Sequence, residues 1–300
     1  MKSPAGLSVG QMDRNSSKTA VLVCQGRAVA DGRLAPDRFS DTTARLLLTP
    51  AELLGVERAR RDDPPKAIAE RLDFEMLRAN AEVMVPRTVA IDDAVRARLN
   101  PQLVILGAGL DGRAWRMTEL AGIDVFEVDH PASQADKVSR IDHLVPTTRA
   151  LHFVPVDFTT DSLGALLAGG HHDATKPTTW IWEGVVPYLT PTEVIATMNV
   201  IAAASTAGSR LIVNYQVPSI RAKVGAVVAR LMSAIARREH PMANEPRRSA
   251  WTPAAMASLL SSHGWRVSAD DDLLTLAAGL GLDIKHARSL STGRVAVADR

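Results

Sequence analysis

The chain has 300 residues, and its 35 Lys and Arg against 33 Asp and Glu give a formal net charge of +2. A balance this even does not favour nucleic acid as a partner, and the single cysteine, Cys24, excludes an internal disulfide. No apolar run is long enough for a membrane span, and residues 1–18 lack the apolar core of a signal peptide. We therefore expect a soluble cytoplasmic protein with one large α/β domain and a lid, or two small domains.

The first hundred residues are predicted to form a helical cap. Apolar residues recur at helical spacing over residues 20–28. Thr49-Pro50-Ala51-Glu52 begins a second helix, because it combines a capping hydroxyl, a first-turn proline and a reciprocal glutamate. Arg58–Lys66 is charged and contains prolines, which predicts a surface loop. A further helix is expected after Pro86, with Ile91 on its apolar face.

From Pro101 the pattern changes to strands alternating with helices, which predicts a mostly parallel sheet. Thr190-Pro191 and Thr252-Pro253 begin helices that we expect to end near Gly208 and at Gly264. Two short strands near the end of the chain are expected to form a terminal pair. The predicted strands are residues 103–106, 126–129, 154–156, 180–182, 211–215, 265–267 and 294–297.

The turn after the first strand carries Gly107, Gly109 and Gly112 in the G-x-G-x-x-G spacing of dinucleotide enzymes, a weak signal by itself. A dinucleotide would place its pyrophosphate on this turn, where Asp111 would be an unfavourable neighbour. The same aspartate is acceptable beside a sulfonium or an ammonium. About twenty residues on, Asp129 ends the second strand, where a carboxylate can accept both hydroxyls of a ribose. The turn therefore favours S-adenosylmethionine over a dinucleotide.

Several motifs occur together in one order along the chain. They lie between about Lys18 and Leu189, which is most of the chain, and the carboxyl-terminal third carries no comparable motif. The motifs are Pro86-Arg87-Thr88 with Ile91-Asp92-Asp93, Leu103–Arg116, Phe126–Pro131, Val154–Phe158 and Trp182–Val185. In this order they resemble the leucine carboxyl methyltransferase family, in particular its bacterial branch of small-molecule O-methyltransferases.

The resemblance implies a Rossmann-like class I methyltransferase fold, with a mostly parallel sheet whose last strand is antiparallel. Residues 1–100 would form the helical cap and residues 101–300 the core, with residues 219–250 inserted as a substrate lid. That segment holds seven Lys or Arg against two acids. It reads either as a lid that attracts an anion or as an amphipathic helix with a solvated basic face.

The resemblance also implies which residues bind S-adenosylmethionine. The carboxylate of the cofactor would be held by Arg87 and Lys18, the ribose by Asp129, and the amino group or sulfonium region by Glu183. Asp157 and Phe158 would bracket the adenine. Together with the turn glycines, the cofactor-binding candidates are Lys18, Arg87, Gly107, Gly109, Asp129, Asp157, Phe158 and Glu183.

Each candidate has an ordinary structural alternative. Arg87 or Lys18 could be a solvated cation, and Asp157 with Phe158 could be a strand-end acid beside a core aromatic ring. Glu183 follows a buried strand, where a carboxylate needs a partner, and a salt bridge to an arginine would also satisfy it. Glu127 shares a strand face with Asp129, so one of the two could be a structural acid paired with an arginine, and by family position Asp129 is the ribose partner.

The acceptor is less well specified. A carboxylate, with a pKa of about 4, is already an anion at neutral pH, whereas an alcohol needs a general base. The motifs contain neither an obvious base nor a metal-ligand cluster, and His171-His172 is expected to face solvent. The absence of a base favours a small carboxylate, and the resemblance implies a polyketide-like acid. The catalytic residues are unknown, and the candidates for the substrate pocket are Tyr188, Tyr215, Arg247 and Trp251.

Three hypotheses follow. The first is an S-adenosylmethionine-dependent O-methyltransferase acting on a small molecule. The second is an NAD(P)-dependent oxidoreductase, which explains the glycines and Asp129 but gives no role to Arg87, Asp157 or Glu183. The third is a binding protein that holds the cofactor without turnover. The sequence leaves open whether the protein is a monomer or a homodimer.

Overall fold

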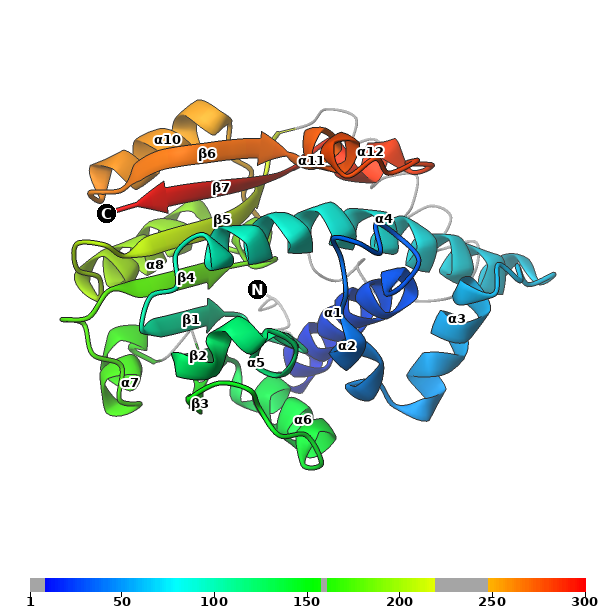
Figure 1. Cartoon of the computed structure of the whole chain (residues 1–300), viewed down its shortest axis with the longest axis horizontal. Helices are drawn as coiled ribbons and strands as arrows, with labels where there is room; N and C mark the ends of the chain where they lie inside the picture. Colours follow the sequence, from blue (N-terminus) through cyan, green and yellow to red (C-terminus); the bar gives the residue numbers. More distant parts are fainter. Residues whose placement is uncertain (1–8, 158–160, 219–247) are drawn as a thin grey trace, which may run out of the picture.

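The computed structural model describes residues 9–157, 161–218 and 248–300. Over these residues the chain forms a seven-stranded sheet of order β3-β2-β1-β4-β5-β7-β6 (Figure 1). The first five strands are parallel, and β7 runs antiparallel to both of its neighbours. The strands are β1 (Gln102–Leu106), β2 (Asp124–Asp129), β3 (Ala150–Pro155), β4 (Thr178–Trp182), β5 (Arg210–Gln216), β6 (Arg266–Asp272) and β7 (Gly293–Asp299).

The central strands are continuous apolar runs because both faces of the sheet are covered. All residues of β1 and β4 are buried. On one face, Phe126, Trp180 and Trp182 pack with α7 (Leu163–Gly169), α8 (Pro191–Ala203) and α10 (Pro253–Ser262). The other face packs against the second half of α4 (Ile68–Arg96), α5 (Arg113–Arg116), α11 (Leu273–Gly279) and α12 (Ala287–Leu290). The sheet therefore has helices on both faces, which agrees with the predicted Rossmann-like fold.

The amino-terminal helices lie beyond the arrowheads of the parallel strands, at their carboxyl ends (Figure 1). They have a core of their own, to which Cys24, Phe39, Val56 and Phe74 contribute. The predicted capping box at Thr49 is present. The helices are α1 (Val9–Ala30), α2 (Thr42–Leu46), α3 (Pro50–Arg60) and the first half of α4. This layer covers the edge of the sheet at which the predicted cofactor residues lie.

Helix α4 does not begin near Pro86, as the sequence suggested, but runs through it. A proline inside a helix removes one hydrogen bond and costs about 3 kcal/mol. Val85, Pro86, Arg87 and Thr88 are all buried, so packing on both sides of the helix outweighs this cost. The continuous helix carries Arg87 from the amino-terminal layer to the sheet.

Other boundaries also differ from the predictions. Helix α3 extends to Arg60, into the segment expected to be a loop, because Arg60 donates hydrogen bonds to the carbonyl groups at the end of α1. Helix α8 ends at Ala203, before Gly208. The helix after the glycine turn, α5, has only four residues and is followed by the 3-10 helix η1 (Thr118–Gly122).

The prediction that both histidines at 171–172 face solvent is wrong for His172. His171 is exposed, whereas His172 is buried between the Phe126 and Trp180 rings and bonds to Thr178. Burial lowers the pKa of His172. Among the described residues, no group of three or more His, Cys, Asp or Glu is arranged to hold a metal ion.

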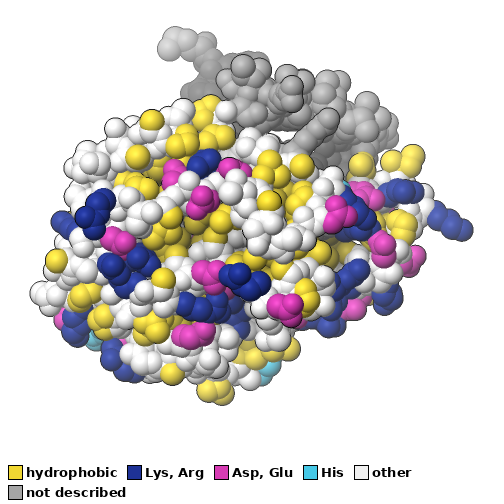
Figure 2. Space-filling model, turned by 45° about the horizontal axis from the view of Figure 1, so that its top comes forward, with side chains coloured by type: hydrophobic (Ala, Val, Ile, Leu, Met, Phe, Trp, Pro, Cys, Tyr) yellow, Lys and Arg dark blue, Asp and Glu magenta, His cyan; other side chains and the backbone are white. Residues whose placement is uncertain are grey.

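The surface agrees with the even charge of the sequence. On the face shown in Figure 2, basic and acidic side chains are interspersed with apolar ones over the described residues. In the same part of the chain, no helix is both long and apolar enough to cross a membrane. Remaining helices are α6 (Pro131–Ile141) and the 3-10 helix η2 (Val186–Tyr188).

Candidate functional site

The glycine turn links the end of β1 to the end of β2. The amides of Gly107 and Ala108 both donate to the carbonyl oxygen of Val128. Gly107 and Gly109 have φ angles of +68° and +48°, in the left-handed region that favours glycine. A Cβ atom on Gly107 would lie 2.3 Å from a methyl group of Val185. The group that approaches Gly107 closely, and so requires glycine there, is the Val185 side chain of the protein itself.

We expect Gly107→Ala to destabilise the fold by roughly 1–3 kcal/mol, because it adds both the clash with Val185 and strain at a positive φ angle. Urea denaturation would measure the change. In a Gly107→Ala/Val185→Ala double variant the clash is relieved while the strain stays, so part of the stability should return. Equal stability of Gly107→Ala and the parent protein would contradict this account.

Helix α1 lies against the same turn. A Cβ atom on Gly109 would be 3.0 Å from the side chain of Ala20, which belongs to α1. Arg27, further along the helix, donates to the carbonyl oxygen of Leu110. Lys18 lies two residues before Ala20, and its side chain is exposed. The amino-terminal helix therefore covers the turn through Ala20 and Arg27.

Asp129 stands at the end of β2 beside the turn. Its two carboxylate oxygens accept hydrogen bonds from the amides of Gly109 and His130. Burial raises the pKa of Asp129, and the two amides offset part of that rise. Each carboxylate oxygen has a second lone pair, so the group retains capacity to accept further hydrogen bonds at the carboxyl edge of the sheet.

Glu183 follows β4 and is held by two arginines. Its Oε1 lies 2.7 Å from Nε of Arg87, and its Oε2 lies 2.9 Å from Nη1 of Arg113. Burial would raise the pKa of Glu183, but the charges of Arg87 and Arg113 outweigh it and hold the pKa below its ordinary value. Both readings of Glu183 from the sequence remain compatible with this geometry, because the salt bridge lies at the predicted cofactor edge.

Arg87 reaches this edge from α4. Within the described residues it forms an ion pair with Glu183, and its Nη2 donates to the thioether sulfur of Met84, 3.0 Å away. A thioether is a weak acceptor. Burial, together with the charges of Arg27 and Arg113, lowers the pKa of Arg87, although Glu183 opposes them. The guanidinium is thus buried with one strong partner and one weak partner.

Sequence reasoning missed the ion network that surrounds this pair. Arg113 is fully buried and also contacts Asp92 and Asp111. Asp92 in turn binds Arg116, with Nη1 of Arg116 2.6 Å from Oδ2 of Asp92. The signal was present in two places: the acid in the glycine turn stands two residues before Arg113, and Asp92 lies on the predicted apolar face beside Ile91.

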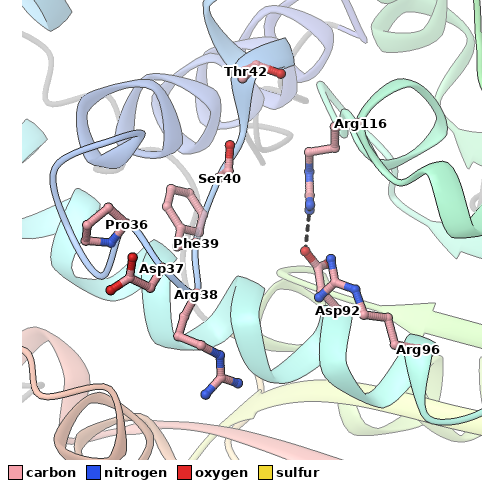
Figure 3. A pocket seen from close by; sticks show the side chains of 9 residues that line it. All are labelled: Pro36, Asp37, Arg38, Phe39, Ser40, Thr42, Asp92, Arg96 and Arg116. Atoms are coloured by element: carbon pink, nitrogen blue, oxygen red, sulfur yellow. Dashed lines mark hydrogen bonds and ion pairs between the residues drawn. The ribbon is translucent and has the colours of Figure 1, made fainter.

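The outer end of this network opens onto a groove of about 210 Å³ between the α1–α2 loop, α4 and α5 (Figure 3). Figure 3 shows Arg116 and Asp92 pointing toward one another across the groove, with Arg96 beside them. Arg96 and Arg38 are themselves paired with Asp93. Ion pairs therefore connect this groove through Asp92 and Arg113 to Glu183.

A second buried ion pair joins β2 to α6. Lys137 on α6 donates to the Glu127 carboxylate and to the carbonyl oxygen of Asp111, and it lies over the Trp115 ring. Glu127 is therefore a structural acid, and its partner is this lysine and not an arginine. Burial raises the pKa of Glu127 to about 7, against the lowering effect of Lys137.

The remaining candidates lie in different surroundings. Asp157 is half-buried just after β3, at the same edge of the sheet. Tyr188 is half-buried in η2, and Trp251 is half-buried and packs on the core. Tyr215 is fully buried in β5, and its hydroxyl donates to Asp270. Phe158, Arg247 and residues 219–247 of the predicted lid lie outside the described residues.

Comparison with known proteins agrees with this architecture. A family model described as leucine carboxyl methyltransferase matches residues 20–202. A Mycolicibacterium gilvum protein assigned by name as an S-adenosyl-L-methionine-dependent methyltransferase is 33% identical over 256 residues, which are 83% of this chain and 82% of that protein. A Mycobacterium marinum protein assigned the same name is 37% identical over 64% of this chain and 63% of its own length.

A solved structure shares the fold. The crystal structure of a DUF574 family protein from Streptomyces avermitilis superposes with a TM-score of 0.58 at 14% identity, covering 85% of this chain and 94% of that one. At this identity the likeness concerns the arrangement of strands and helices alone.

Proposed function

The chain belongs to the leucine carboxyl methyltransferase family, and from this membership we propose that it is an S-adenosylmethionine-dependent methyltransferase that methylates a carboxylate oxygen of a small molecule. The observation that carries the proposal is the Arg87–Glu183 pair, buried at the carboxyl edge of the sheet. A cation and an anion side by side are complementary to the carboxylate and ammonium groups of an amino acid, which is the head of this cofactor.

The residues at the edge fit the cofactor. Arg87 has a thioether where a carboxylate would be a far stronger acceptor. Asp129 has lone pairs left for the ribose hydroxyls. We propose that Arg87 and Lys18 hold the cofactor carboxylate, Glu183 its amino group and Asp129 its ribose. By family position, Asp157 and Phe158 bracket the adenine and the Gly107–Gly109 backbone lies beside the head.

When bound, S-adenosylmethionine supplies a methyl group activated by the sulfonium charge. The protein's own part is then to align the acceptor and to exclude water. The amino-terminal helices that cover the carboxyl edge serve that exclusion, because α1 packs directly on the glycine turn. Tyr188 and Trp251, at the same edge, are our candidates for contact with the acceptor, as is Arg247.

The lowered pKa of two carboxylates at this edge supports the proposal that the acceptor is already ionised and needs no general base. Glu183 and Asp111 are both paired with Arg113, and neighbouring positive charges lower the pKa of each against the effect of burial. Carboxylates held in this way are poor general bases. An acid substrate needs no base, because a carboxyl group with a pKa of about 4 is ionised at neutral pH.

The test is binding followed by turnover. Titration calorimetry should show binding of S-adenosylhomocysteine and none of NAD(P), and the reverse result would favour the oxidoreductase. Labelled S-adenosylmethionine would then be incubated with aromatic and polyketide acids and with the matching alcohols. We expect methyl esters of the acids. Binding without transfer to any member of the panel would instead support a silent binding protein.

The pH dependence provides a further prediction. With a carboxylic acid as acceptor, kcat should stay level from about pH 6 to about pH 9, because the nucleophile is fully ionised throughout that range. With an alcohol acceptor that depends on a base, the rate should rise with pH as the base loses its proton. A rising profile measured with the best acid substrate would contradict the proposed chemistry.

A further inference from the structure

The Arg113 side chain forms ion pairs with three different carboxylates. It is fully buried and bonds to Asp92 of α4 through Nε, and to Asp111 of the glycine turn and Glu183 after β4 through Nη1. The Asp111 carboxylate also accepts from the backbone amide of Arg113. One guanidinium thus ties together three segments that meet at the carboxyl edge of the sheet.

The two carboxylate oxygens of Glu183 contact different arginines. Arg87 contacts Oε1 and Arg113 contacts Oε2. The two arginines differ in their other partners: Arg113 has two further carboxylates, whereas Arg87 has only the Met84 sulfur among the described residues. Arg87 is therefore the partner of Glu183 that a ligand can recruit, and Arg113 is the fixed one.

We propose that Arg113 is a positioning residue, which holds Glu183 in place for the amino group of the bound cofactor. This inference rests on the proposed function. A carboxylate that binds Arg87 competes with Glu183 for that guanidinium, and an ammonium group beside it takes over the freed oxygen of Glu183. During this exchange Arg113 keeps the other oxygen in place. Asp92 and Asp111 fix Arg113 in turn.

The planar fork of arginine matters for this role. Its Nε and Nη1 atoms reach different carboxylates at the same time, whereas a lysine offers one compact ammonium group. Arg113→Lys keeps the positive charge that balances the buried acids and removes only the fork. The head of the cofactor should therefore be bound less well by this variant, while binding of the adenosine part should be unaffected.

Two ligands distinguish binding of the amino-acid head from binding of the nucleoside. S-adenosylhomocysteine carries the amino-acid head, and 5′-methylthioadenosine carries the same nucleoside and sulfur without it. In the parent protein we expect S-adenosylhomocysteine to bind more tightly. In Arg113→Lys its affinity should fall by at least about tenfold, the loss typical of a charged hydrogen bond, and the affinity for 5′-methylthioadenosine should stay unchanged. Calorimetry measures both.

Arg116→Lys is the matched control, because Arg116 is a nearly buried arginine on the same helix that binds Asp92 without contacting Glu183. It should leave the ratio of the two affinities at its parent value. If Arg113→Lys does not fold, Asp92→Asn takes its place, since it removes the negative charge that anchors Nε of Arg113 and should lower the ratio in the same direction.

Either an equal loss for both ligands or no loss for S-adenosylhomocysteine in the folded variant would overturn the positioning role. So would equal affinities of the two ligands for the parent protein, because the head would then not be recognised. Failure of the proposed function has a different signature: the parent protein would bind neither ligand.

Discussion

Arg87→Ala is expected to weaken binding of S-adenosylhomocysteine by about 1.5–3 kcal/mol, which corresponds to roughly ten- to hundred-fold in Kd. The reason is the exchange of partners at this guanidinium. In the structure it is held by Glu183 and by the sulfur of Met84, and we propose that the cofactor carboxylate becomes its strong acceptor. Titration calorimetry on the purified variant measures the change directly.

Fold integrity should survive the substitution, because Glu183 keeps its bond to Arg113 and is not left as an unpaired buried charge. Arg96→Ala is a suitable control on the same helix. Arg96 is partly exposed and pairs with surface acids, so its loss should leave the Kd unchanged. An unaltered Kd for Arg87→Ala would mean that the assignment of this arginine is wrong.

Lys137→Met should cost about 3–5 kcal/mol of stability at alkaline pH, the range found when one partner of a buried ion pair is removed. Lys137 is buried and donates to Glu127 and to the carbonyl oxygen of Asp111. Methionine fills a similar volume without charge, so the Glu127 carboxylate would be left in an apolar environment. Urea denaturation at several pH values measures the effect.

The pH dependence follows from Glu127. In the folded protein burial raises its pKa to about 7 from an ordinary 4.5. The folded state therefore binds more protons between these values, and the contribution of Glu127 to stability is lost as the pH rises through about 7. Without Lys137 the pKa should rise further, so the variant should lose more stability than the parent on going from acid to alkaline pH.

A Glu127→Gln/Lys137→Met double variant tests the origin of the effect, because it replaces both charges by neutral groups. Much of the lost stability should return, and its excess dependence on pH should disappear. The account fails if the single variant is equally destabilised at acid and alkaline pH, since protonation of Glu127 would then play no part.

The sheet and its connections could be predicted because they depend on local patterns. The strands at 103–106 and 180–182 are short apolar runs followed by turn residues, and the structure confirms both as buried strands. The antiparallel last strand, which the family resemblance implied, was also confirmed. Capping hydroxyls at Thr49 and Thr190 gave the helix starts correctly. Such signals are contained within a few neighbouring residues.

The errors share a different cause, which is packing between distant segments. Pro86 signals a break, yet burial on both sides keeps α4 continuous. His172 was expected to face solvent, yet its side chain is buried between aromatic rings of β2 and β4. Neither contact leaves a trace in the local sequence.

The candidate site divides in the same way. Gly107, Asp129 and Glu183 follow predicted strands, so their common edge could be inferred from chain order alone. The partners that tie the edge together could not. Arg113 meets Asp92 across 21 positions and Glu183 across 70, and Lys137 rather than an arginine meets Glu127. Which of several charges pair is decided only once the sheet and helices have assembled.

The place of β7 bears on how the protein acquires its shape during synthesis. This strand is inserted between β5 and β6, although both precede it in the chain. Ribosomes deliver residues in order, so β6 has emerged before the neighbour that joins it to the sheet exists. β5 also pairs with β7, from Arg210 opposite Asp299 to Gln216 opposite Gly293, and this pairing cannot form before β7 has been made. A nascent chain stalled before residue 293 would therefore leave β5 open on one side and β6 without its partner strand. Unpaired strand edges are the surfaces that chaperones and aggregates recognise.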